Sequence, residues 1–249
     1  MDFALAVIAF APGLAFGSFL NVLAARVPLK RSIVSPTSAC MDCGHEIAWY
    51  DNVPLVSWLL LRGKCRACGT SISVRYFLVE LVTGLLVAAC FLKFGFSADA
   101  FVAAFVCLAL VTVSAVDFER MIIPNRIVVP AAAVTLVANT ALHPSPRWLL
   151  AALAASTFLF ASALIYPKGM GMGDVKLAVL IGAALGRATA VGLMAGMVAA
   201  LLPSLVLFAR HGSAARKMKI PFGPFLAIGC IVALFAGHPI LDWYWGLSR

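Results

Sequence analysis

Long apolar stretches recur along the whole sequence and constrain its fold more than any other feature. They cover residues 3–25, 76–96, 99–116, 127–142, 147–166, 175–186, 187–209 and 222–241. Roughly 20 apolar residues span a bilayer as a helix, and inside the lipid every backbone polar group must be paired within the protein. With 63% hydrophobic and 12% charged residues, the chain is predicted to be an all-α polytopic membrane protein with about eight transmembrane helices.

The sixth stretch, residues 175–186, is too short to cross a bilayer unaided. Residues 175–209 are therefore expected to form either two spans or one long bent element. The seventh stretch contains Gly192 and Gly196, a GxxxG spacing typical of helix packing.

The first stretch is N-terminal, so a cleaved signal peptide must be considered. No basic region precedes it, Asp2 is acidic, and the segment continues through Asn21 to Arg26. These features are not those of a signal peptide. Residues 1–26 are expected to form the first transmembrane helix.

The basic residues follow the positive-inside rule if the N-terminus lies outside the cytosol and every stretch crosses. Only four of the 19 lysines and arginines then fall on the outer side, namely Lys93, Arg147, Arg187 and Arg249. This orientation places the loop at residues 27–75, Asp117 and Asp174 on the cytosolic side. The net charge of +9 is then explained by topology, and no nucleic-acid partner is expected because the basic residues are spread over several loops.

The loop at residues 27–75 contains two CxxC pairs and reads as a small cytosolic domain between the first and second helices. The cysteines are Cys40, Cys43, Cys65 and Cys68. Two such pairs in one loop are typical of a tetrahedral zinc site, and four thiolates would close that site and make it structural. Disulfides are the alternative, disfavoured because the cytosol keeps thiols reduced. His45, near Cys43, could substitute as a ligand, although a surface histidine is favoured.

Two aspartates lie at the edges of apolar stretches. Asp174 follows the glycines at 169, 171 and 173, and Asp117 ends the third stretch ahead of Pro124. A carboxylate at membrane depth is costly and usually marks a functional site, and neighbouring glycines let another chain's backbone approach it. Two converging carboxylates could share a proton, one activating water and the other polarising a carbonyl. Spacing alone does not establish convergence, and either aspartate could instead cap a helix.

Taken together, these motifs make the chain resemble the type IV prepilin peptidases, membrane aspartic proteases of the GxGD type that are often also N-methyltransferases. The resemblance covers nearly the whole length. Besides the four cysteines, it is carried by Arg26, Pro28, Asp117 and residues 17–22, 62–66, 75–76, 79–81, 123–125, 171–176 and 221–227. Two positions depart from the family pattern: Asn125 stands where Asp is frequent, and Met41-Asp42 stand where Pro is usual.

The resemblance implies that Asp117 and Asp174 are the catalytic pair and that the four cysteines bind structural zinc. Residues 76–249 would form the transmembrane protease domain. The substrates would be prepilins or pseudopilins in the lipid bilayer, cut on the cytosolic side of the bacterial inner (plasma) membrane. S-adenosylmethionine, as donor for methylation of the new N-terminus, is implied by family analogy only, because the sequence shows no Gly-rich fingerprint for it. No residues are assigned to that cofactor.

Three alternatives stay open at this point. The chain could be a protease without methyl transfer, or a non-catalytic membrane zinc module that recruits secretion machinery. A presenilin-like enzyme shares GxGD, but no Pro-Ala-Leu motif follows Asp174. Glu80, an acid at a membrane edge, is expected either to pair with Arg75 or Lys64 or to help bind an amine or a cofactor.

Overall fold

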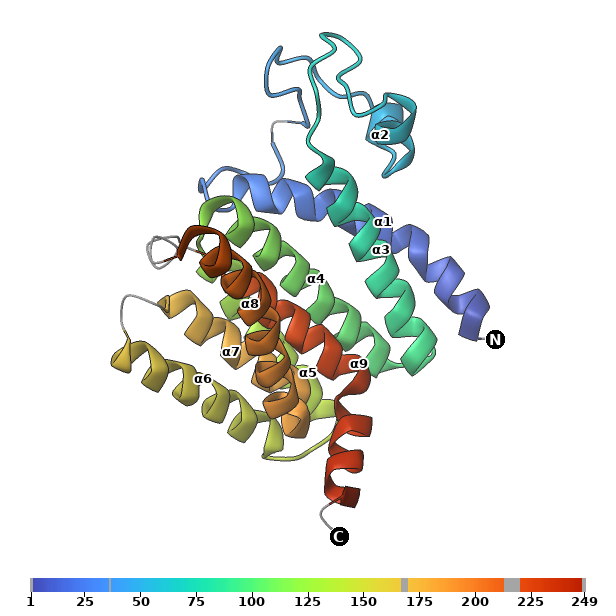
Figure 1. Cartoon of the computed structure of the whole chain (residues 1–249). Helices are drawn as coiled ribbons and strands as arrows, with labels where there is room; N and C mark the ends of the chain where they lie inside the picture. The colour runs from blue at the N-terminus through green and yellow to red at the C-terminus, as the bar shows by residue number, and fades with distance from the viewer. Residues whose placement is uncertain (1, 36, 167–169, 213–219, 248–249) are drawn as a thin grey trace. The chain divides into compact units, whose positions relative to one another are not determined.

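The computed structural model describes residues 2–35, 37–166, 170–212 and 220–247, and this part of the chain is helical apart from loops and two isolated β-bridges (Figure 1). Gly169 and Arg249, named above, lie outside these residues. The elements in chain order are α1 (Asp2–Arg26), η1 (Trp49–Asn52), α2 (Val56–Leu60), α3 (Val74–Phe94), α4 (Ala98–Arg120), α5 (Asn125–Leu142), α6 (Arg147–Ile165), α7 (Met172–Leu185), η2 (Gly186–Ala188), α8 (Thr189–His211) and α9 (Gly223–Leu247).

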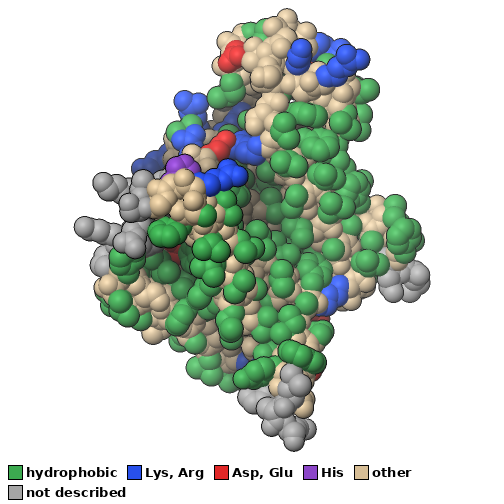
Figure 2. Space-filling model, in the orientation of Figure 1, with side chains coloured by type: hydrophobic (Ala, Val, Ile, Leu, Met, Phe, Trp, Pro, Cys, Tyr) green, Lys and Arg blue, Asp and Glu red, His purple; other side chains and the backbone are tan. Residues whose placement is uncertain are grey.

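The predicted multi-pass membrane architecture is confirmed. Among the described residues, seven stretches of helix are long and apolar enough to cross a membrane. One of them, Met172–His211, consists of α7, η2 and α8, so each apolar stretch of the sequence corresponds to one of the helices α1 and α3 to α9. Large apolar side chains such as Leu201, Leu202 and Leu205 are exposed on α8, and apolar side chains cover most of the surface in view in Figure 2. Such a surface suits contact with lipid.

Residues 175–209 form two helices. The first, α7, ends at Leu185 because Gly186 takes a left-handed φ of +53°, which a glycine adopts without strain. The short helix η2 follows, and in Figure 1 the chain turns back there into α8. The two helices then pack on different neighbours, α7 on α5 and α6, and α8 on α9.

The chain divides into two compact units, Met1–Ala115 and Val116–Arg249. In the first unit, α1 and α3 pack closely along each other. A side chain at Gly17 would place its Cβ 2.7 Å from the Cα of Glu80. Only a glycine allows this approach of the two backbones. The predicted division into residues 1–26, 27–75 and 76–249 follows different boundaries and stays a prediction.

In the second unit, α7 is the most enclosed helix. Its side chains at Leu177, Ala178, Leu180 and Ile181 are fully buried, and Gly182 lies directly against the α6 backbone at Ala152. The glycines of the GxxxG spacing on α8 pack against the backbone of α9 at Gly229. Close packing of small residues therefore holds both helix pairs together.

Candidate active site and metal centre

In the second unit, the chain brings together one helix C-terminus and three helix N-termini. The last turn of α4 carries Asp117 and the first turn of α7 carries Asp174, with side chains that are 5% and 8% exposed. The starts of α5 and α9 complete the group. The first N–H groups of a helix have no partner within the helix, so such ends offer donors to carboxylates.

Asp117 accepts a hydrogen bond from the first residue of α9. The backbone N–H of Gly223 donates to Oδ2 of Asp117 over 3.0 Å. A Cβ at position 223 would lie 2.8 Å from the same oxygen. Glycine is thus required at 223 for the carboxylate to approach the amide this closely.

Asp174 caps the helix to which it belongs. The backbone N–H of Gly171 donates to Oδ2 of Asp174 over 3.1 Å, and the N–H of Asp174 donates to the carbonyl of Gly171, also over 3.1 Å. The carboxylate contact is the half of a capping box that the third helical residue supplies, while the backbone carbonyl of Gly171 accepts in place of the side chain that glycine lacks. The capping role left open by the sequence therefore exists, and it fixes the position of the carboxylate.

The helix ends that carry the two aspartates meet at the connection between α4 and α5. Ile123, in the connection between α4 and α5, lies beside both sites. A Cβ at Gly173 would lie 2.8 Å from the Cβ of Ile123, and one at Gly223 would lie 3.3 Å from its Cδ1. One side chain therefore packs against the glycine that precedes Asp174 and against the glycine that contacts Asp117.

A polar contact also joins α5 to α7 close to the two aspartates. Nζ of Lys176 donates to Oδ1 of Asn125 over 2.9 Å, which ties the first turn of α7 to the first residue of α5. The residues that follow the two aspartates in the sequence are thus also neighbours in space.

Two buried carboxylates within electrostatic reach of each other can hold a single proton between them, because ionising both at once is costly. Such a pair can act as an acid and a base together. Fold and site define a multi-pass membrane protein with a paired-carboxylate centre at the ends of its helices.

The four cysteines of the loop at residues 27–75 converge in the first unit. The sulfur atoms of Cys40, Cys43, Cys65 and Cys68 all lie within 4.8 Å of one another, and the thiols are free. Tetrahedral zinc with Zn–S bonds of about 2.3 Å places neighbouring sulfurs roughly 3.8 Å apart. The distance between the sulfurs of Cys40 and Cys68 is 3.8 Å. This donor set could hold a zinc ion, and His45 does not belong to it.

The two cysteine pairs sit in matching turns. In the first, Cys40 N–H donates to the His45 carbonyl and Gly44 N–H to the Cys40 carbonyl; in the second, Cys65 and Gly69 repeat the pattern. Gly44 and Gly69 have φ values of +71° and +74°, which explains the glycine at each position. The Thr70 hydroxyl, by hydrogen bonding, lowers the pKa of the Cys68 thiol to about 6.

An ion pair fastens the second of these turns to η1. The guanidinium of Arg66 donates to both carboxylate oxygens of Asp51, over 2.7 and 2.6 Å. These hydrogen bonds hold the pKa of Asp51 below its usual value. The pair is bidentate, which gives it a fixed geometry.

Sequence reasoning missed two contributors to the paired-carboxylate site. The amide of Gly223 lies in the late block at residues 221–227, which carried the resemblance without an assigned role. Ile123 was noted only as part of its motif. Gly223 itself was the signal in the sequence that could have indicated this contact, because glycine allows a backbone to approach another group closely.

Comparison with known proteins agrees with this architecture. Residues 12–94 match the bacterial peptidase A24 N-terminal domain, and residues 104–236 match the type IV leader peptidase family. The chain belongs to the type IV leader peptidase family. No solved structure matches it.

Several relatives carry the name prepilin leader peptidase/N-methyltransferase. That of Myxococcus xanthus is 41% identical over 82% of this chain and 64% of its own length. That of Bacillus subtilis is 36% identical over 95% of this chain and 96% of its own length. That of Stutzerimonas stutzeri is 34% identical over 95% and 92%, respectively.

Proposed function

We propose that this protein removes the leader peptide of type IV prepilins or pseudopilins by a two-aspartate mechanism and then methylates the new N-terminus. The observation that carries the protease proposal is that Asp117 and Asp174 are both buried at helix ends beside Ile123, each held by a backbone amide. The names of the relatives support both activities.

Hydrolysis would use the single proton that the pair shares. The ionised carboxylate takes a proton from water while the water oxygen adds to the carbonyl carbon of the scissile peptide. The protonated carboxyl donates its proton to the carbonyl oxygen. Collapse of the tetrahedral adduct breaks the C–N bond as the newly protonated carboxyl donates its proton to the leaving nitrogen. One hydroxyl of the adduct gives its proton to the other carboxylate, which restores the shared-proton state.

The proposed location is the bacterial inner membrane, with the paired aspartates and the cysteine loop on the cytosolic side. The distribution of lysines and arginines between the loops supports this orientation. A substrate held in the bilayer by its own apolar helix would meet the aspartates at the membrane edge.

The four cysteines are proposed to bind structural zinc. The spacing of their sulfurs fits a closed tetrahedral site, which leaves no position for a substrate or a water molecule. Zinc would therefore hold the two turns together and take no part in hydrolysis.

For the second activity, S-adenosylmethionine would supply a methyl group on a sulfonium. The deprotonated N-terminal amine would take the methyl group as the C–S bond breaks, leaving S-adenosylhomocysteine, and would lose one proton. Cleavage must come first, because the amine exists only after the leader has been removed.

Mass spectrometry of a prepilin co-expressed with the protein tests both activities at once. The wild-type protein is expected to give a shortened and methylated N-terminus. Asp117→Asn and Asp174→Asn keep the shape of the side chains but cannot ionise, and each is expected to leave the leader attached. The exposed Asp242 of α9 offers a matched control, Asp242→Asn, that should cleave normally. Normal cleavage by either active-site variant would refute the two-aspartate mechanism.

A further inference from the structure

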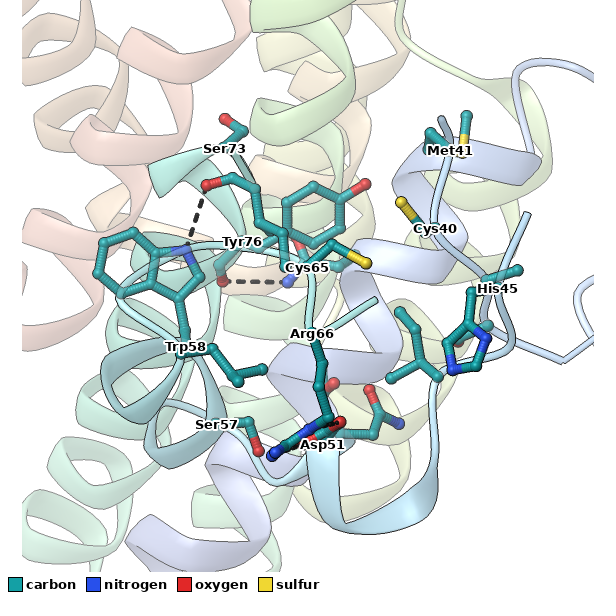
Figure 3. Close-up of a pocket in the computed structure, with 18 of the residues that line it drawn as sticks. Cys40, Met41, His45, Asp51, Ser57, Trp58, Cys65, Arg66, Ser73 and Tyr76 are labelled. Carbon is teal, nitrogen blue, oxygen red and sulfur yellow. Dashed lines mark hydrogen bonds and ion pairs between the residues drawn. The ribbon is translucent and has the colours of Figure 1, made fainter. Parts of the chain in front are cut away.

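The first unit contains a cavity of about 420 Å³ between α1, the start of α3 and the cysteine loop (Figure 3). Side chains from these three parts line it, including Asn21, Ser57, Trp58, Arg66, Tyr76 and Glu80. Small-molecule sites typically have volumes of roughly 300 to 1,000 Å³. The cavity is therefore large enough for a ligand the size of a nucleoside.

Asn21 of α1 brings an unpaired acceptor to this cavity. Its side chain is 3% exposed, and its Nδ2 donates to the carbonyl of Tyr76 over 3.1 Å. Because a carbonyl only accepts, the amide orientation is set and Oδ1 faces away from Tyr76. Oδ1 is buried and has no hydrogen-bond partner among the described residues. A buried acceptor without a donor is costly, so this atom points to a ligand that donates a hydrogen bond through an N–H or O–H group.

Glu80 of α3 adds a negative charge to the same cavity. The carboxylate is 9% exposed, and its Oε2 accepts a hydrogen bond from the backbone N–H of Leu55 over 2.8 Å. Within the described part of the chain, no basic side chain forms an ion pair with it. Among the other acids of the lining, the half-buried Asp51 is already paired with Arg66, and Asp42 and Glu46 are exposed. A buried carboxylate without a counter-charge favours a cationic ligand.

Aromatic side chains form part of the wall. The indole of Trp58 is fixed by donation from its Nε1 to the carbonyl of Ile72 over 3.3 Å and by packing on Phe77, with ring centroids 5.1 Å apart. Tyr76 lines the cavity beside it, as Figure 3 shows. Aromatic surface of this kind suits a flat heterocycle and a neighbouring positive charge.

We infer that this cavity is the binding site of S-adenosylmethionine, with Glu80 balancing the positive charge of the ligand and Oδ1 of Asn21 accepting a hydrogen bond from one of its N–H groups. This ligand combines a nucleoside, an ammonium and a sulfonium. The flat base of the nucleoside suits the aromatic wall of the cavity, and the two positive groups suit the carboxylate of Glu80. This inference rests on the methyl-transfer part of the proposed function. It also predicts weaker binding of S-adenosylhomocysteine, which lacks the sulfonium charge.

Direct binding to the purified full-length protein tests the site without relying on turnover. Equilibrium dialysis with labelled S-adenosylmethionine is expected to show binding about tenfold or more weaker for Glu80→Gln, which keeps an acceptor for Leu55 but removes the charge. Affinity for S-adenosylhomocysteine should fall less in this variant. Asn21→Leu should weaken both ligands. Two matched controls should bind as the wild type does. Thr83→Val lies one turn further along α3, and Asn139→Leu is the same kind of change as Asn21→Leu but lies in the second unit.

Leader cleavage, measured in parallel, shows that each variant is folded. Hydrogen exchange of the wild type with and without S-adenosylmethionine gives a second readout, with protection expected at residues 18–22, 55–58 and 76–80. Wild-type affinity in both Glu80→Gln and Asn21→Leu, or protection confined to other segments, would overturn the site while leaving methyl transfer intact. A wild-type protein that cleaves prepilin but neither binds the donor nor methylates would remove the methyl-transfer function and the inference together.

Discussion

The amide of Gly223 donates to Oδ2 of Asp117 over 3.0 Å, between residues 106 positions apart in the chain. The contact joins the end of α4 to the beginning of α9. This contact explains why position 223 is a glycine, because any larger residue would push the carboxylate of Asp117 away from the amide.

Gly223→Ala is expected to abolish most leader cleavage without unfolding the protein. The new Cβ would lie 2.8 Å from Oδ2 of Asp117 and would displace the carboxylate, and a shift of about 1 Å at a catalytic group can lower the rate roughly a hundredfold. A prepilin cleavage assay measures the loss. At Gly246, on the same helix, a Cβ would meet no atom within 4 Å, so Gly246→Ala should cleave normally. Equal activity of the two variants would show that the amide contact is unimportant.

The two glycines before Asp174 are expected to respond differently to alanine. At Gly173 the added Cβ would lie 2.8 Å from the Cβ of Ile123, whereas at Gly171 the nearest atom, Oδ2 of Asp174, would be 3.4 Å away. Overpacking of the first kind typically costs about 1–3 kcal/mol. Gly173→Ala should therefore lower the melting temperature and the cleavage rate more than Gly171→Ala does. The reverse order would mean that Gly171 is needed for access of the substrate.

Asn125→Asp is expected to be tolerated. The carboxylate would keep the contact with Nζ of Lys176, now 2.9 Å from Oδ1 of Asn125, and would add an ion pair at an exposed position, where such pairs contribute less than about 1 kcal/mol. Asn125→Leu removes the acceptor and should reduce cleavage. Cleavage and thermal stability measured on both variants show whether position 125 needs only an acceptor for Lys176. A large loss in the aspartate variant would place position 125 in substrate recognition.

Metal analysis of the purified protein is expected to find about one zinc ion per chain. Cys65→Ser should lose most of the metal and lower thermal stability, because the two turns would no longer be held together. Cys230→Ser, at a buried position on α9 outside the cluster, should keep the metal. Full zinc content in the Cys65 variant would exclude the four-sulfur site.

Much of the fold was predictable because few backbone structures are stable inside a lipid bilayer. A backbone in hydrocarbon must pair its own polar groups, so apolar length alone predicts helices, and each stretch from residues 3–25 to 222–241 corresponds to a helix. The spacing of Cys40, Cys43, Cys65 and Cys68 likewise predicted the sulfur cluster, because each CxxC pair forms a local turn. The break at Gly186 was anticipated only as one of two possibilities.

By itself the sequence determined an all-helical membrane protein, a four-cysteine cluster and two aspartates at helix ends, since all three depend on patterns within one segment. Only the tertiary structure decided that Ile123 lies beside both glycines, that Gly223 holds Asp117, and that Asn21 and Glu80 line one cavity. These relationships join side chains from different helices. These contacts depend on how the helices pack against one another, and no periodic pattern within one segment of the sequence predicts that packing.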